Sequence, residues 1–225
     1  MNNFEYKKIK LIEDIVGYTY PEELFIEILL DRKTPFYLRI NRLPQLVKAA
    51  RKYTIKGTEY QFAPAYRKDD LEEKKSDKQN IRSSHCFWLD IKTSDVTMPI
   101  VKQHYEMEKI LDKFQNSLLK YKITPTFVLS NGFVFHVFFI FETHYLAPFT
   151  VFKKIQKTLT KISPGIFAAD ISGFIHLPDT INYQIKENPQ EVKLIGDYRN
   201  LYTDEENGFI GFKHQDFQGI LERFG

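Results

Sequence analysis

The amino-acid sequence predicts an α+β fold, in which helices flank a central sheet, and three observations support this prediction. The chain of 225 residues is 43% hydrophobic, enough to bury a sizeable core within one domain. Two long segments repeat apolar residues at the spacing of an amphipathic helix. Several shorter apolar runs end at polar turns, as strands do. The 20 Phe and 13 Tyr residues also argue against disorder, because disordered chains are poor in such side chains.

Charge and cysteine content narrow the class of protein. The formal net charge of +3 permits a polyanionic partner but does not require one. A single cysteine, Cys86, excludes an internal disulfide and a multi-cysteine zinc site, and it fits a reducing cytoplasm. The sequence shows no secretory signal, and no run reaches the roughly 20 apolar residues that span a bilayer. We therefore expect a soluble, cytoplasmic protein with no membrane contact.

The N-terminal part, about residues 1–54, is predicted to be helical. In PEELFIEILLDR, residues 21–32, the apolar residues have helix spacing after a proline and two acids. LPQLVKAARKY, residues 43–53, predicts a second helix with a proline in its first turn. TEYQFAPAY, residues 58–66, is typical of a strand. The polar stretch over residues 66–84 carries both charge signs, which predicts a solvated loop.

The middle of the chain predicts a strand, a helix and a hairpin. HCFWLDIK, residues 85–92, is a short apolar run with a polar end, which predicts a buried strand that delivers Asp90 to a sheet edge or cleft. Residues 99–120 have the spacing of an amphipathic helix that packs on the sheet. Residues 124–142 predict two strands around the letters SNG, where the Asn-Gly pair supplies the positive φ angles of a tight turn.

The remaining segments continue this mixture. PFTVFKKIQKTLTKI, residues 148–162, predicts another amphipathic helix. Residues 167–184 predict a region of strands and loops, and EVKLIGDY, residues 191–198, predicts a further strand. FKHQDFQGILERF, residues 212–224, predicts a small C-terminal element.

His136 stands in the most apolar segment, FVFHVFFIF, and its role is open from this segment alone. Side chains alternate across a strand, so Phe135 and Val137 share one face while His136 and Phe138 share the other. One interpretation is a core histidine whose ring is satisfied by a backbone carbonyl. The other is a functional histidine, which is favoured by two further segments that place an aspartate at the end of an apolar stretch.

Three segments, in this order along the chain, resemble the motifs of a known superfamily. FWLDIK, residues 87–92, matches an acidic motif at a strand end. LSNGFVFHVFF, residues 129–139, matches a small-residue turn that leads to a histidine. DISGFIHLPDTINYQIK, residues 170–186, matches an aspartate followed by an RLPGTxN-like sequence. The similarity spans about residues 55–200, and over this range the chain resembles the archaeo-eukaryotic primase superfamily, especially primase-polymerases and replication primases of plasmids and viruses.

The resemblance implies one primase-like domain over residues 1–225, with a motif-bearing core at about 55–200 and a small C-terminal element at about 201–225. Its fold would be the primase-polymerase catalytic core, in which helices flank an RRM-like, antiparallel or mixed central sheet. The implied function is DNA primase or primase-polymerase activity during replication. The implied reaction is metal-dependent nucleotidyl transfer from nucleoside triphosphates on a single-stranded DNA template, with Mg²⁺ or Mn²⁺ as the cofactor and a replicative helicase as a further partner.

The matched residues receive the roles that the resemblance implies. Asp90, Asp170 and His136 would be catalytic, and the two aspartates would bind the metal, since Mg²⁺ prefers oxygen ligands. His136 would donate a hydrogen bond to the triphosphate. The expected nucleotide-binding residues are Ser130, Gly132, His136, Lys92, Thr180, Asn182 and Lys186. Ordinary roles compete with these, because an aspartate at a strand end is also a common turn or cap residue, and LPDTIN is also typical of a surface loop.

Lys92 stands where the acidic motif should have its second carboxylate. Lys92 and Asp90 point to the same side of an extended strand, and an ammonium ~4 Å from a divalent cation is repelled by about 8 kcal/mol at an effective dielectric of about 20. In one interpretation the ammonium replaces one cation and binds phosphate oxygens. In the other, the site has lost metal-dependent chemistry and keeps a binding role. His176, Asp179 and Gln184 also depart from the pattern, which has arginine, glycine and lysine there.

The alternative function is a catalytically degenerate module that binds single-stranded nucleic acid as a replication initiator or accessory subunit. The basic clusters RKTPFYLRINR and KAARKY provide phosphate contacts beside aromatic residues that stack on bases. The candidate nucleic-acid-binding residues are Arg39, Arg42, Lys48, Arg51 and Lys52. An ordinary solvated surface explains the same clusters, and a structural protein without a nucleic-acid role is a third hypothesis.

Overall fold

The computed structural model describes residues 11, 13–15, 25–31, 34–39, 42, 45, 59–69, 79–93, 95, 97–185, 187–204, 208–209 and 211–225. The chain divides into two compact units. The first unit comprises residues 1–86, 144–147 and 171–192, and the second comprises residues 87–143, 148–170 and 193–225. Because each unit is assembled from separate segments, motifs that are close in sequence fall in different units.

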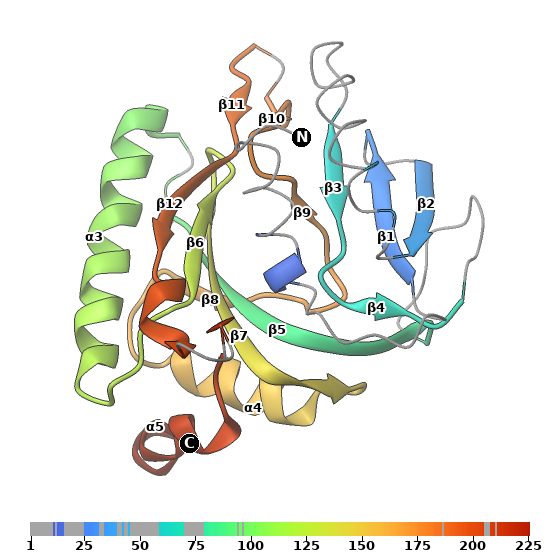
Figure 1. The fold of residues 1–225 in the computed structure, drawn as a ribbon. Helices are drawn as coiled ribbons and strands as arrows, with labels where there is room; N and C mark the ends of the chain where they lie inside the picture. The colour runs from blue at the N-terminus through green and yellow to red at the C-terminus, as the bar shows by residue number, and fades with distance from the viewer. Residues whose placement is uncertain are drawn as a thin grey trace. The chain divides into compact units, whose positions relative to one another are not determined.

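The first unit is built around a small sheet (Figure 1). Its strands are β1 (Phe25–Leu30), β2 (Thr34–Arg39), β3 (Tyr60–Phe62), β4 (Tyr66–Arg67) and β9 (Ile175–His176), with the first residues of β5 (Ile81–Ile91). β1 pairs antiparallel with β2 along its whole length and with β3 on its other side, and β9 extends the sheet beyond β3. Two short strands, β10 (Ile181–Asn182) and β11 (Gln190–Glu191), form a separate antiparallel pair.

The predicted helix over residues 21–32 is wrong, because Phe25–Leu30 forms the strand β1. The four central residues of β1 are all buried, so both faces of this strand are covered. A strand that is covered on both faces is a continuous apolar run, which residue spacing cannot distinguish from a helical segment. The pairing with β2 and β3 therefore decides the structure here. The second predicted helix, residues 43–53, lies outside the described residues except for Gln45.

Most other predicted elements are confirmed. The strand predicted over residues 58–66 corresponds to β3 and the start of β4, while the predicted loop over residues 66–84 is shorter, because its two ends belong to β4 and β5. The region predicted over residues 167–184 holds short strands and loops. The confirmed helices of the second unit are α3 (Ile100–Leu119), α4 (Thr150–Leu159) and, within the C-terminal element, α5 (Gln218–Phe224) after a 3-10 turn over His214–Phe217.

The second unit holds a sheet with the strand order β12, β6, β7, β5, and β8 pairs with the other side of β5. The strands that it adds are β6 (Phe127–Ser130), β7 (Phe135–Leu146), β8 (Ile166–Ala168) and β12 (Lys193–Asp197). Antiparallel ladders join β12 to β6, β6 to β7, and β8 to β5. The helix α3 runs beside β12 (Figure 1), and Gln115 Nε2 of α3 donates to Tyr198 Oη just after β12, at 3.0 Å. Two short strands, β13 (Thr203–Asp204) and β14 (Gly208–Phe209), form an additional antiparallel pair.

Helices of the second unit pack on one face of its sheet. Phe87 of β5 and Phe141 of β7 both contact Phe152 of α4 and Phe217 of the C-terminal element, with ring centroids 4.8–6.0 Å apart. The helix α3 reaches the same face, since the ring of His104 meets Phe135 edge-on. These contacts confirm the alternation predicted for β7. The opposite face carries the even-numbered residues of β5 and β7, which include Asp90 and His136.

The turn between β6 and β7 differs from the predicted one. Ser130 pairs with Phe135, so the loop has four residues, 131–134, and Gly132 is the one residue of this loop with positive φ, at 91°. Asn131 stays outside the left-handed region and instead uses its side chain, because Asn131 Oδ1 accepts hydrogen bonds from the backbone N–H groups of Phe133 and Val134, at 3.0 and 2.9 Å. An Asx side chain that satisfies its own turn in this way is a common alternative to a positive φ angle.

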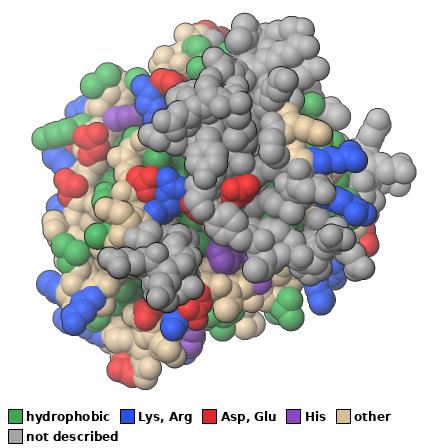
Figure 2. All heavy atoms as spheres, viewed as in Figure 1, with side chains coloured by type: hydrophobic (Ala, Val, Ile, Leu, Met, Phe, Trp, Pro, Cys, Tyr) green, Lys and Arg blue, Asp and Glu red, His purple; other side chains and the backbone are tan. Residues whose placement is uncertain are grey.

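Charged side chains of both signs are mixed on the surface. Figure 2 shows Lys and Arg interspersed with Asp and Glu over the described part of the visible face. Any basic binding surface in that part of the molecule is therefore local, as the nearly balanced composition suggests. Within the described residues, no helix combines the length and the apolar composition that crossing a bilayer requires.

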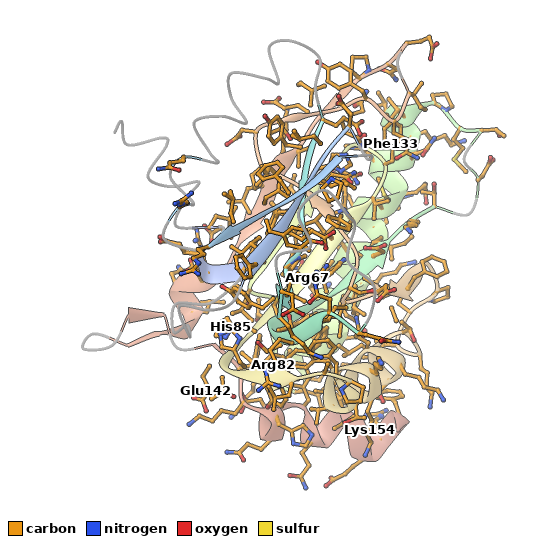
Figure 3. The ribbon with its side chains drawn as sticks, turned by 90° about the vertical axis from the view of Figure 1, so that its right-hand side faces the viewer. Arg67, Arg82, His85, Phe133, Glu142 and Lys154 are labelled. Carbon is orange, nitrogen blue, oxygen red and sulfur yellow. The ribbon has the colours of Figure 1, made fainter. Side chains whose placement is uncertain are left out.

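The first unit contains a buried ion pair. Arg67 Nε donates to Glu27 Oε2 at 2.8 Å, and the two side chains are 1% and 0% exposed. The guanidinium also donates to the carbonyl oxygens of Ala65 and Ser172, at 3.0 and 3.2 Å, so its remaining nitrogens are satisfied as well. Figure 3 labels Arg67 among the strands of this unit. Because Ser172 follows Asp170 by two residues, this arginine anchors the chain near the start of the third motif, residues 170–186.

Two histidines of the first unit stack on one another. The rings of His85 and His144 lie 5.0 Å apart at 33°, and Tyr66 contacts His144 at 5.7 Å. Burial, followed by the charge of His144, lowers the pKa of His85 to about 3. His85, labelled in Figure 3, is therefore a neutral core residue at ordinary pH.

Candidate functional site

Asp90 occupies the end of the buried strand β5. Residues 83–89 are all buried, and Asp90 is the first side chain after them that is partly accessible, at 17% exposed. The sequence folds in this way because HCFWL is apolar on both faces, whereas a carboxylate is stable only where water or a polar partner reaches it. The strand therefore presents Asp90 on the face of the sheet opposite to α4.

His136 and Lys92 both hold the Asp90 carboxylate. His136 Nδ1 lies 2.8 Å from Asp90 Oδ1, and Lys92 Nζ lies 3.1 Å from Asp90 Oδ2. Burial raises the pKa of Asp90, but the hydrogen bond and attraction of His136, followed by the attraction of Lys92, outweigh it and hold this pKa below its usual value. Each oxygen of the Asp90 carboxylate therefore accepts a hydrogen bond. Lys92 lies on the same side of the strand as Asp90, as predicted.

Asn131 determines which nitrogen of His136 carries the proton. The Oδ1 atom of Asn131 is already committed to two backbone N–H groups of the loop, so its Nδ2 group faces His136 Nε2, at 3.2 Å. An amide NH₂ can only donate, so Nε2 accepts, and Nδ1 carries the proton that it donates to Asp90. In this arrangement both ring nitrogens of His136 are engaged within the protein.

The β6–β7 loop satisfies its own backbone. Ser130 Oγ accepts the N–H group of Gly132 at 3.2 Å, while Asn131 accepts the two N–H groups that follow. The Gly132 carbonyl in turn lies 2.9 Å from His104 Nε2 of α3. Ser130 and Gly132 thus flank Asn131 in this loop, and the backbone N–H groups of residues 132–134 have partners within the loop.

Asp170 follows β8 and lies on a segment that is anchored to β5. Gln156 Nε2 of α4 donates to two carbonyl oxygens, that of Trp88 at 2.8 Å and that of Ala169 at 3.0 Å. This single buried amide joins the residue before Asp170 to the strand that ends with Asp90. Asp170 itself is exposed. The sequence offers one signal for Gln156, a polar residue on the buried side of an amphipathic helix, and sequence reasoning missed it.

The LPDTIN segment belongs to the first unit. Thr180 and Asn182 are buried, Thr180 Oγ1 donates to the Leu177 carbonyl at 2.7 Å, and Asn182 Oδ1 accepts the Gln184 N–H at 2.9 Å. Asp179 has a φ of 59°, a left-handed conformation that suits the glycine of the resembled motif. The loop therefore keeps a backbone feature of that motif, while its two polar residues hold the loop together. Lys186 lies outside the described residues.

Two predicted nucleic-acid-binding residues can be placed. Arg39, at the end of β2, and Arg42 are exposed. The Arg39 guanidinium lies over the Phe25 ring at 5.7 Å, so it pairs a charge with an aromatic surface on β1. Lys48, Arg51 and Lys52 fall outside the described residues.

The described residues do not fit the two-metal centre that the resemblance implies. Among them, no group of three His, Cys, Asp or Glu side chains is placed to hold a metal ion. Lys92 Nζ, 3.1 Å from Asp90 Oδ2, already brings a positive charge to the oxygen that a cation would share. We therefore assign no chemical step at this site to a metal ion.

Comparisons with known proteins support the fold. No protein-family model matches the chain, and no curated protein sequence does either. The catalytic domain of primase RepB′, solved with initiator DNA, is similar with a TM-score of 0.53 at 12% identity, over 98% of this chain and 93% of that one. A second structure of primase RepB′ has a TM-score of 0.53 at 11% identity, and the similarity covers 98% of this chain and 62% of that one. The primase-polymerase domain of cyanophage S-2L has a TM-score of 0.49 at 12% identity, and the similarity covers 82% of this chain and 88% of that one.

The likeness to RepB′ establishes the class of fold. The chain has the α+β fold of primase-type domains, with a central antiparallel sheet, as the sequence predicts. Of the residues that carried the resemblance, Asp90 and His136 are in contact in the second unit. The chain spans about three fifths of the RepB′ chain, 62% of its length.

Proposed function

We propose that this chain is a primase-type replication domain that binds a nucleoside triphosphate and single-stranded DNA and transfers nucleotides to a growing chain. The observation that carries the proposal is the contact between Asp90 and His136, which lie on the face of the second unit's sheet opposite to α4. Two residues 46 positions apart in the sequence meet there through charge and hydrogen bonding rather than through apolar packing. The primase-like fold gives this pair its functional context.

Lys92 is the proposed phosphate ligand of this site. Its side chain is 45% exposed while its ammonium contacts Asp90, so it can reach a ligand in solvent and Asp90 at once. A lysine ammonium binds phosphate oxygens as a point charge. His136 then acts on the phosphate only indirectly, because Asp90 and Asn131 engage both of its nitrogens. Its role is to orient the Asp90 carboxylate and to keep it ionised.

Primer synthesis tests the catalytic part of the proposal. The wild-type chain, Asp90→Asn and Lys92→Asp would be compared on single-stranded DNA with nucleoside triphosphates, in Mg²⁺, in Mn²⁺ and without added metal. We expect the wild type to extend or begin chains and Asp90→Asn to lose this activity. If Lys92→Asp creates activity in a chain that is otherwise inert, the wild-type chain is not the enzyme proposed here.

A binding module without catalysis is the second candidate, and the ion pair between Lys92 and Asp90 favours it. An acidic motif whose second position carries a paired ammonium has no free carboxylate there to hold a cation. Steep salt dependence of single-strand binding that is unchanged in Asp90→Ala would support this candidate. In that case the exposed Arg39 and Arg42 are the first residues to replace, and a replicative helicase is the partner to test for recruitment.

A further inference from the structure

Phe167 is an exposed aromatic residue directly beside Asp90. In the antiparallel ladder between β5 and β8, Asp90 pairs with Phe167, so the two side chains share one face of the sheet. Directly opposed residues of such a ladder have Cβ atoms roughly 4.5–5.5 Å apart. The Phe167 side chain is nevertheless 51% exposed. A large ring therefore stands open to solvent next to the carboxylate of the proposed site.

The backbone around Phe167 is held on both sides. Before it, the Lys92 N–H group donates to the Gly165 carbonyl at 3.1 Å. Gly165 has a φ of 85°, and a Cβ there would lie 2.7 Å from Cδ1 of Ile110, so the glycine lets α3 approach closely. After it, Gln156 binds the Ala169 carbonyl. The ring is thus presented from a short strand with little freedom to move, and the sheet leaves it uncovered.

The same strand end supplies a charge that complements the ring. Lys92 follows Asp90 by two residues and points to the same side, as its contact with Asp90 shows. A flat apolar ring and an accessible ammonium therefore flank one carboxylate, Phe167 across the ladder and Lys92 along the strand. This combination suits a ligand with an aromatic ring at one end and negative charge at the other, which is the chemistry of a nucleotide.

We propose that Phe167 is the stacking surface for the base of the nucleoside triphosphate whose phosphates contact Lys92. The proposal rests on the function proposed above and names the base-binding part of the same site. Stacking uses the π-face that every base has, so this surface holds the four bases with similar strength. Preference among bases then comes from pairing with the template and not from Phe167.

Measuring how the full chain binds two ligands distinguishes the contribution of the base from that of the phosphates. The ligands are ATP and inorganic triphosphate, and the variants are Phe167→Ala, Phe167→Trp and Lys92→Met. We expect Phe167→Ala to weaken the binding of ATP about 10-fold or more, as for the loss of one stacked base. The same variant should leave the binding of inorganic triphosphate unchanged. Phe167→Trp should restore ATP binding, and Lys92→Met should weaken both ligands.

Tyr105 provides the matched control. It is another exposed aromatic residue of the second unit, 56% exposed on α3, where its ring contacts Lys109. Tyr105→Ala should leave the binding of both ligands unchanged. Because Phe167 is half exposed, its replacement should also leave the unfolding transition intact, which a thermal melt checks.

The outcomes distinguish this inference from the proposed function. If Lys92→Met weakens the binding of ATP but Phe167→Ala does not, the proposed phosphate site is supported and the proposed stacking surface is refuted. Equal weakening of ATP and inorganic triphosphate by Phe167→Ala also refutes it, since the ring would then act on the phosphates. If the wild-type chain binds neither ATP nor inorganic triphosphate, the proposed function fails and this inference fails with it.

Discussion

Two ion pairs, Glu27–Arg67 in the first unit and Asp90–Lys92 in the second, differ in their access to solvent. Glu27 and Arg67 in the first unit are wholly buried, and the guanidinium donates hydrogen bonds to a carboxylate and to two backbone carbonyl oxygens. Asp90 and Lys92 in the second unit lie at a strand end, and Lys92 is nearly half exposed. The buried pair has no access to a ligand, so it can only hold strands together. The accessible pair contributes little to stability and keeps a charge available for binding.

The histidines of the two units differ in the same way. His85 stacks on His144 in the interior of the first unit, and burial keeps its ring neutral. His136 in the second unit is also mostly buried, but a carboxylate and an amide engage its two nitrogens. The ring of His85 is held by packing against His144, whereas hydrogen bonds to Asp90 and Asn131 fix the tautomer of His136. The two histidines therefore differ in their polar partners more than in their burial.

The largest expected effect is the loss of the buried pair. Glu27→Gln leaves Arg67 as a buried guanidinium without its counter-ion, and we expect the free energy of unfolding to fall by about 3–5 kcal/mol. Urea denaturation followed by circular dichroism measures this loss. The double variant Glu27→Leu with Arg67→Met is the control, because it removes both charges and should recover most of the stability. A loss below about 1 kcal/mol in Glu27→Gln would show that the pair is not buried as described.

A smaller effect is expected from His85 as the pH falls. Its pKa is about 3 in the folded chain and about 6.5 when unfolded, so between these values the unfolded state takes up a proton that the folded state does not. Stability is therefore full above about pH 6.5 and declines toward pH 3, by an amount on the order of 3 kcal/mol at pH 4. Denaturation of the wild type and of His85→Phe at pH 7 and pH 4 measures the difference. Equal pH dependence in the two chains would contradict this assignment.

The smallest expected effect belongs to the accessible pair. Lys92→Met should change the free energy of unfolding by less than about 1 kcal/mol, because an exposed ion pair is screened by solvent. It should also raise the pKa of Asp90 toward its ordinary value, which carboxyl NMR titration detects. Since the folded pKa of Asp90 is lowered, its contribution to stability is present above its unfolded pKa and is lost as the pH falls through the folded one. An unchanged Asp90 titration in Lys92→Met would show that the ammonium does not act on this carboxylate.

The sequence predicts the contact between Asp90 and His136 best, because each residue interrupts an apolar run. An aspartate at the end of HCFWL and a histidine inside FVFHVFFIF both interrupt apolar runs, and the structure brings them into contact. Asn131 was predicted only as a turn residue, because its bond to His136 depends on how the loop folds back. Sequence reasoning missed Phe167, because the sequence does not show whether a phenylalanine in a strand is exposed or buried. Its register opposite Asp90 exists only after β8 has paired with β5.

By itself, the sequence determined the α+β composition of the chain, most of its helices and the order of its acidic and histidine motifs, because apolar spacing and polar interruptions are local properties. The tertiary structure alone decided that Phe25–Leu30 is a strand, since a segment covered on both faces takes its conformation from its partners. It also decided that Lys92 and His136 hold the same carboxylate, and that Gln156 joins the two aspartate-bearing segments. Apart from the contact of Lys92 with Asp90 two residues before it, these contacts join residues that are distant in sequence. Their geometry follows from pairing register and helix packing, which no local pattern encodes.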